Sequence, residues 1–135
     1  MKLTHYGALI AIIITTSANA NNKTLPLTNE NAVRAIIGEA ANQDDRGMLA
    51  IACVIRNRRS LQGVFGANAK HVHNQPAWVW AKATKAWQQS ATQDITNGST
   101  HWENVTAFGE PSWAKHMIRT IKIKDHQFFK DPHFN

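Results

Sequence analysis

The chain has 135 residues, of which 43% are hydrophobic and 18% are charged, and its formal net charge at pH 7 is +6. This length allows one domain with one modest core, and the single cysteine, Cys53, excludes an intrachain disulfide. The positive charge favours a polyanionic partner, such as a cell-wall polymer, a membrane surface or a nucleic acid, and does not choose among the three.

The first twenty residues have the pattern of a secretory signal peptide. Lys2 precedes an uncharged run over residues 8–16, and the Ala-Asn-Ala of residues 18–20 provides the small residues of a cleavage site. The run is shorter than the about 20 apolar residues that span a bilayer, although an uncleaved N-terminal anchor stays open as the alternative. We therefore expect residues 1–20 to be a cleaved signal peptide. Residues 21–135 would be a domain exported to the periplasm or to the extracellular cell wall, without a stable membrane span.

Two amphipathic helices are expected at the start of this domain. Thr28 or Asn29 can cap the first helix, and apolar residues then recur at helical spacing up to Ala41. Glu39 lies beside this apolar stripe, at a boundary that is compatible with a cleft or with open solvent. The second helix fits residues 46–60 and should form the centre of the core. The arginines of its last turn are explained by the helix dipole.

The second half of the chain predicts shorter elements. Residues 61–75 contain glycines and asparagines and are expected to form a loop, and a helix should follow over residues 76–92. The remaining expected elements are an extended piece over residues 99–104, a short helix over residues 111–117 and a terminal hairpin within residues 121–129. The sequence thus predicts an α+β domain that is mostly helical, with a short β-hairpin region.

Two carboxylates have no local structural explanation. The aspartates are accounted for by helix caps, a turn and the tail, which leaves Glu39 and Glu103 as candidates for acid–base chemistry. A glycosidase commonly uses one protonated acid and one ionised partner. Burial among apolar groups raises the pKa of a carboxyl and makes it a proton donor near neutral pH.

The five tryptophans are many for so small a domain. The helix over residues 76–92 should place Trp80, Ala83, Thr84 and Trp87 on one face. Buried tryptophan is the commoner outcome, and we expect Trp87 and Trp113 in the core. Trp102 is kept as a candidate exposed platform on which a sugar ring or a base could stack.

Metal and nucleotide chemistry find little support in the sequence. His71 and His73 would lie on one side of a strand, but no third ligand has the spacing of a zinc site. No P-loop, G-x-G-x-x-G, H-E-x-x-H or G-x-S-x-G motif occurs. No metal and no cofactor are therefore expected. A secreted metal-dependent nuclease that uses His71, His73 and His101 is the alternative ranked last.

Four short motifs occur in a fixed order along the chain. They are Gly-Glu-Ala at residues 38–40, an apolar helix that ends in Asn57-Arg58, Thr-Asn-Gly-Ser-Thr-His-Trp at residues 96–102, and Trp-Ala-Lys at residues 113–115 followed by Ile-Lys-Asp-His-Gln-Phe-Phe at residues 123–129. This order resembles the SleB-type cell-wall hydrolases, the spore-cortex-lytic enzyme family, over about residues 30–130. The chain departs from the family pattern at Ile37, Ser99 and Lys124-Asp125, and residues 61–77 lack the usual aromatic segment.

The resemblance implies a small lysozyme-like domain that acts on the glycan strands of peptidoglycan, with Glu39 as the catalytic acid. The bond cleaved would be the β-1,4 bond between N-acetylmuramic acid and N-acetylglucosamine. A lytic transglycosylase would need Glu39 alone as acid and base, whereas a muramidase would need a second carboxylate, for which Glu103 is the candidate. His101, Trp102 and Glu103 would bind the substrate from the facing wall, and the small Gly38 and Ala40 would let the sugar approach the carboxyl.

A non-catalytic peptidoglycan-binding module on the same fold stays open as the second class of function. It would need the basic surface and Trp102 but not Glu39. In either case we expect a monomer with peptidoglycan as its partner, and no nucleic acid.

Overall fold

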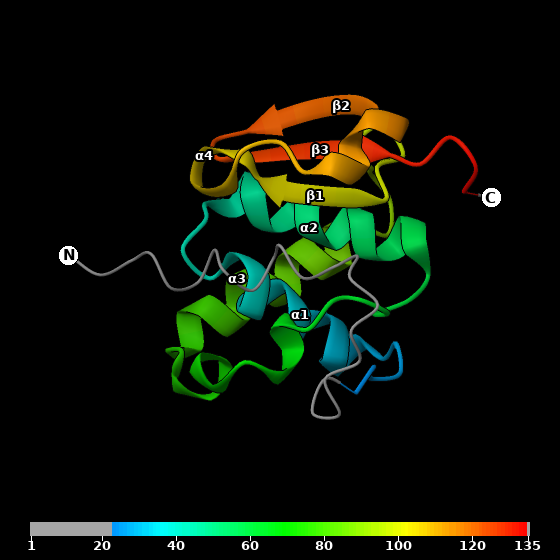
Figure 1. Ribbon diagram of the computed structural model, residues 1–135. Coiled ribbons are helices and arrows are strands. Elements are labelled where there is room, and N and C mark those ends of the chain that lie inside the picture. The colour runs from blue at the N-terminus through cyan, green and yellow to red at the C-terminus, as the bar shows by residue number, and fades with distance from the viewer. Residues whose placement is uncertain (1–22, 135) are drawn as a thin grey trace.

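The computed structural model describes residues 23–134, so the expected signal peptide at residues 1–20 lies outside the described residues. Within this range a group of helices packs against a three-stranded antiparallel sheet (Figure 1). The elements are α1 (Asn29–Ala40), α2 (Asp45–Arg58), the 3-10 helices η2 (Gly66–Asn68) and η3 (Lys70–Asn74), α3 (Ala77–Gln89), β1 (His101–Asn104), α4 (Val105–Phe108), the 3-10 helix η4 (Ser112–His116), β2 (Ile118–Ile123) and β3 (His126–Lys130). The predicted class, a mostly helical, lysozyme-like α+β domain with a short hairpin, is confirmed.

The helix ends follow the local chemistry that the sequence indicated. The Thr28 side chain caps α1 by accepting a hydrogen bond from the Asn31 N–H at 3.1 Å, and Asp44 caps α2 through the Gly47 N–H at 2.9 Å. Helix α2 ends where Arg59 adopts the left-handed conformation, with φ of 57°. Pro76 precedes α3, where its missing N–H costs no hydrogen bond.

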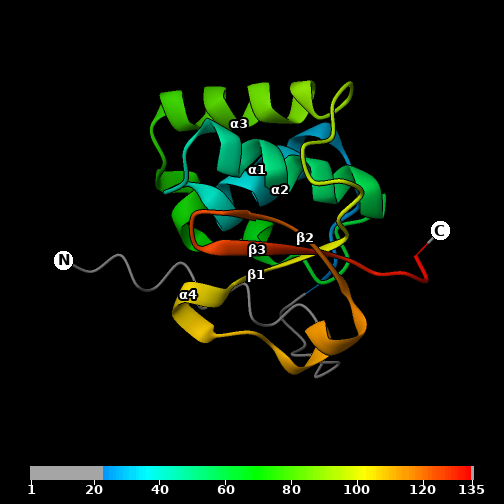
Figure 2. The same ribbon diagram turned by 90° about the horizontal axis from the view of Figure 1, so that it is seen from above.

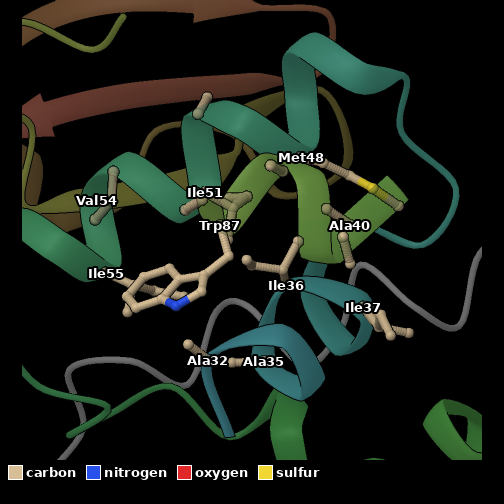
Figure 3. Packing of buried hydrophobic residues seen from close by; sticks show 14 of the residues in the cluster. Ala32, Ala35, Ile36, Ile37, Ala40, Met48, Ile51, Val54, Ile55 and Trp87 are labelled. Atoms are coloured by element: carbon tan, nitrogen blue, oxygen red, sulfur yellow. The ribbon is translucent and has the colours of Figure 1, made fainter. Parts of the chain in front are cut away.

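The core lies between the first three helices, and α2 is its centre as predicted. Ile36 and Ile37 of α1 are fully buried, as are Met48 and Ile55 of α2 (Figure 3). Trp87 of α3 lies in the same cluster and is 7% exposed. These side chains leave water together, which is the main favourable contribution to folding.

The buried face of α3 differs from the prediction. Val79, Ala83, Ala86 and Trp87 are buried, whereas Thr84 is exposed and Trp80 is half-buried. Alanines at two buried positions let α3 approach α1 and α2 closely. The helix is therefore rotated so that Val79 and Ala86 take the buried positions predicted for Trp80 and Thr84, while Trp87 stays buried.

The sheet has the strand order β1-β3-β2, so β3 is central and β1 is an edge. Trp102 lies opposite Phe128, and both belong to the core cluster. His101 lies opposite Phe129 and Glu103 opposite Gln127, so the alternation of a strand directs these residues to the other face. Figure 2 shows α1, α2 and α3 on one side of the sheet and α4 on the other.

No helix within residues 23–134 combines the length and the apolar character that crossing a bilayer requires.

Candidate active site

Glu39 is a buried carboxyl near the end of α1. Only 3% of the residue is exposed, and the neighbouring Ile36 and Ile37 are fully buried. Its Oε1 accepts a hydrogen bond from the Gly66 N–H at 3.1 Å. Its Oε2 is buried and has no hydrogen-bond partner among residues 23–134. The boundary position that the helical pattern left open is therefore an interior one.

Two glycines bring η2 against the end of α1. A Cβ on Gly38 would lie 1.9 Å from the carbonyl oxygen of Gly66, and a Cβ on Gly66 would lie 2.8 Å from Oε1 of Glu39. Real Cβ contacts are not this short, so both positions require glycine. The expectation that Gly38 leaves room for a sugar is wrong, because the backbone of Gly66 occupies that space. The contact instead positions the N–H that binds Glu39.

The environment of Glu39 raises its pKa from the ordinary 4.5 to about 8. Burial is the main cause, because it disfavours the charged form. The hydrogen bond from Gly66 acts in the opposite direction, the charge of Glu103 raises the pKa further and the charge of Arg58 lowers it. Glu39 consequently holds its proton at pH 7, which is the state that a general acid needs.

Glu103 is the second buried carboxyl and comes from β1. It is 2% exposed, and its Oε1 accepts a hydrogen bond from the Asn104 N–H at 2.8 Å. Burial raises its pKa, and the hydrogen bond from Asn104 opposes this rise. The two glutamates are near enough for the charge of Glu103 to act on Glu39, so the fold brings together the two carboxylates that the sequence singled out.

His101 of β1 is half-buried beside an aromatic ring. Its Nδ1 shares a hydrogen bond with Oγ1 of Thr100 at 2.8 Å, and its ring centroid is 5.5 Å from that of Trp113. Burial lowers the pKa of His101 to about 4, and the charge of Arg58 contributes in the same direction. The imidazole is therefore neutral at pH 7 and offers polar ring nitrogens without a charge.

Trp102 does not form the exposed platform that the sequence suggested. Its exposed fraction is 0%, and it packs in the core cluster with Phe128. The reason is the register of β1, which directs Trp102 toward the helices and its two neighbours away from them. Trp113, expected in the core, is half-buried and packs edge-on against Phe129 with ring centroids 5.1 Å apart. Trp113, and not Trp102, is therefore the tryptophan whose ring contacts His101.

Arg58 is a residue of the candidate site that sequence reasoning missed. The helix dipole accounted for all the arginines of this turn, but the side chain of Arg58 donates hydrogen bonds to the backbone oxygens of Thr100, at 3.5 Å, and Gln62. Its charge acts on both Glu39 and His101. The Asn57-Arg58 ending of the apolar helix was the available signal, but it assigned no role to Arg58.

His71 and His73 do not lie on a strand, because residues 70–74 form the 3-10 helix η3. His71 makes hydrogen bonds with the backbone of Ile37 and Gly38, so it holds the end of α1 next to Glu39. His73 pairs with Arg34 at 3.2 Å. No group of three or more histidine, cysteine or acidic residues within residues 23–134 is arranged to hold a metal ion.

No protein-family model matches the sequence, and no curated protein matches it either. Two solved structures are similar in fold. One is the catalytic domain of the germination-specific lytic transglycosylase SleB from Bacillus anthracis, with a TM-score of 0.57 and 22% sequence identity over 76% of this chain and 93% of that domain. The other is the catalytic domain of the Bacillus cereus SleB protein, with a TM-score of 0.57 and 21% identity over 84% of this chain and 99% of that one.

The similarity extends over nearly the whole of both solved domains at low sequence identity. It agrees with the order of motifs along the chain, which resembles the same proteins. Residues 23–134 therefore have the fold of the SleB catalytic domains.

Proposed function

We propose that this protein is a peptidoglycan-cleaving glycosidase with Glu39 as its general acid and base. The observation that carries the proposal is the state of Glu39, a buried carboxyl with a pKa of about 8 and with Oε2 unbonded among residues 23–134. The fold shared with two SleB catalytic domains supports the substrate class, since one of them is described as a lytic transglycosylase. The bond proposed is the β-1,4 bond between N-acetylmuramic acid and N-acetylglucosamine.

The reaction can proceed with one carboxyl. The proton on Oε2 of Glu39 passes to the glycosidic oxygen as the bond from that oxygen to C1 of the muramic acid breaks. The N-acetyl group of the same sugar stabilises the positive charge that develops at C1. The carboxylate of Glu39 then takes the proton of the C6 hydroxyl, and O6 bonds to C1. The products are 1,6-anhydromuramic acid and a free N-acetylglucosamine end, and Glu39 regains its proton.

The surroundings of Glu39 suit both steps. Burial keeps the proton on the carboxyl for the first step. The Gly66 N–H and the positive charge of Arg58 favour the carboxylate that the second step requires. We assign Glu103 and His101 to binding and orienting the sugar, with Trp102 supporting them from the core. If water replaces the C6 hydroxyl as nucleophile, Glu103 is the carboxylate available to activate it.

The protein would act outside the cytoplasm as a monomer on glycan strands. The signal-peptide pattern of residues 1–20 and the net charge of +6 both support this location, because the wall is exported and anionic.

The test is muropeptide release from purified murein sacculi, analysed by mass spectrometry. The full chain is compared with Glu39→Gln, with Glu103→Gln and with Glu110→Gln, which removes an exposed glutamate outside the candidate site. We expect anhydro products, a loss of at least about 100-fold for Glu39→Gln, and full activity for Glu110→Gln. Equal release by Glu39→Gln and the unchanged protein would remove Glu39 from the mechanism. Saturable binding without any product would instead identify a wall-binding module.

A further inference from the structure

A basic pocket is lined by the last turn of α2 and the end of β3. Both segments lie near the C-terminus in Figure 1. Its volume is about 250 Å³, and its cations are Arg56, Arg59 and Lys130. None of the three forms a salt bridge with a carboxylate of residues 23–134. Asp94, which belongs to the adjoining turn, accepts hydrogen bonds from Asn57 and Gly98 instead.

Arg56 is held in one orientation. Its Nε donates to Oγ of Ser90 at 2.6 Å, its Nη2 donates to the carbonyl oxygen of Trp87 at 2.8 Å, and its guanidinium lies 3.7 Å from the centre of the Trp87 ring. Its Nη1 makes no hydrogen bond within residues 23–134. A fixed guanidinium with a free donor binds an oxyanion without first losing side-chain freedom.

A second, larger hollow shares Arg56 with this pocket. This hollow, the Trp80 groove, has a volume of about 560 Å³ and lies between the start of α1 and the face of α3. The half-buried ring of Trp80 lines it, together with the amide side chains of Asn29 and Gln88. An aromatic ring beside amide groups suits a sugar ring, which presents one apolar face and several hydroxyls.

The helix dipole does not explain the cluster. Cations in the last turn of α2 are favoured by the dipole, which accounts for Arg56 and Arg59, but Lys130 belongs to a strand and adds a third like charge to the same pocket. Like charges that share a pocket repel one another. A bound anion would remove this cost.

The basic pocket adjoins the candidate active site at Thr100, but its cations are not the one that acts on Glu39. Arg58 faces Glu39, whereas Arg56 is two residues away on α2, about 200° around the helix axis. A ligand at Arg56 therefore lies on another side of α2 from the reacting bond.

We infer that the basic pocket and the adjoining Trp80 groove form a second binding site for an anionic glycan, with a sugar against Trp80 and an oxyanion at Arg56, Arg59 and Lys130. The identity of the glycan as the bacterial wall polymer rests on the proposed function. The oxyanion is a carboxylate of a peptide stem or a phosphate of an attached polymer, since the same three cations recognise both. This site keeps the domain on the wall between cleavage events.

The test measures binding of the full chain to insoluble sacculi by co-sedimentation, with Glu39→Gln present in every protein so that the polymer stays intact. The double variant Arg59→Gln/Lys130→Gln changes exposed residues of the pocket. The matched control, Lys85→Gln/Lys122→Gln, removes two exposed charges elsewhere. We expect the pocket variant to raise the Kd about tenfold and the control to raise it less than about twofold. Circular dichroism and the melting temperature check that both variants fold.

The outcomes separate the explanations. Equal weakening by the two double variants would mean diffuse attraction by net charge and would overturn the inference. Complete displacement from sacculi by double-stranded DNA at equal concentration would assign the pocket to nucleic acid and would also overturn it. Hydrofluoric acid removes phosphate polymers from sacculi, so lost binding after this treatment identifies phosphate as the anion and retained binding identifies carboxylate.

Catalysis is scored independently of this binding. With Glu39 restored, the pocket variant should release products from short soluble glycan fragments at the rate of the unchanged chain. If the second-site inference is wrong, the release of products from soluble fragments stays intact. If the proposed function is wrong, no protein releases products, including the unchanged chain.

Discussion

The two walls of the candidate active site are built in different ways. The helical wall consists of the end of α1 and η2, which Gly38 and Gly66 bring into contact. The Gly66 N–H of this contact binds the carboxyl of Glu39. The sheet wall holds Glu103 and His101 through strand register, and each makes its hydrogen bond with the residue next to it in the chain.

The backbone contact accounts for the raised pKa of Glu39. A contact between backbones is rigid and excludes water, so Glu39 is buried with a single donor and keeps its proton. Glu103 is also buried and its pKa is also raised, but its hydrogen bond comes from the adjacent Asn104 and not from a distant segment.

Breaking the helical wall should have the largest effect. Gly38→Ala would place a methyl group 1.9 Å from a backbone oxygen that no side-chain movement can clear. We expect a loss of about 3 kcal/mol in the free energy of unfolding, measured by urea denaturation, together with loss of muropeptide release. Gly47→Ala is the comparison, because its new methyl group would lie 2.7 Å from Cβ of Gln43, a side chain rather than the backbone of a distant segment, so we expect a smaller loss. Equal stability of the two variants would mean that the glycine contact is not a constraint.

The buried proton of Glu39 should appear in the pH dependence of stability. Its pKa is about 8 in the folded protein and 4.5 ordinarily, so the folded state binds more protons between these values. The contribution of Glu39 to stability is complete below pH 4.5 and is lost as the pH rises toward 8. Glu39→Gln lacks this loss, so its stability relative to the unchanged chain should rise by about 2 kcal/mol from pH 5 to pH 7. A constant difference across this range would contradict the raised pKa.

The sheet wall can be tested at Trp102, which is part of the core rather than the sugar site. Trp102→Phe should lower the free energy of unfolding by about 1–2 kcal/mol, because the smaller ring leaves a cavity. The KM for glycan fragments should stay within about twofold of the original, since no face of Trp102 reaches the ligand. A large rise in KM with unchanged stability would restore the exposed platform.

The smallest effect concerns the electrostatic link between the walls. The alkaline limb of the activity profile should follow the pKa of Glu39, since only its protonated form donates. Glu103→Gln should move this limb to lower pH and Arg58→Gln should move it to higher pH, each by about half a unit to one unit. Arg46→Gln, which removes an exposed arginine from the start of α2, should leave the limb in place. Shifts in the same direction for Glu103→Gln and Arg58→Gln would rule out this coupling.

Much of the fold could be predicted because its signals are local. The caps at Thr28 and Asp44 and the turn at Lys124 depend on a few adjacent residues. Helix α3 shows the limit of such signals, because its rotation depends on which side chains the other helices can accommodate. Trp102 shows the limit for strands, since a period of two predicts that neighbours alternate but not which of them faces the core.

The candidate site divides in the same way. Glu39 and Glu103 could be chosen from the sequence because carboxylates are few and the other acidic residues have local explanations. Gly66 and Arg58 could not be chosen, since their roles depend on contacts between segments far apart in the chain, such as the 27 positions between Gly66 and Glu39.

The helical character of the domain, the resemblance to SleB and the candidate acid follow from the sequence, because composition, spacing and motif order are properties of the chain. The burial of Glu39, its raised pKa and the choice of Arg58 as the arginine that acts on it follow from the packed fold. Burial and charge interactions depend on distances through space, and those are set by the packing of α1, η2 and β1.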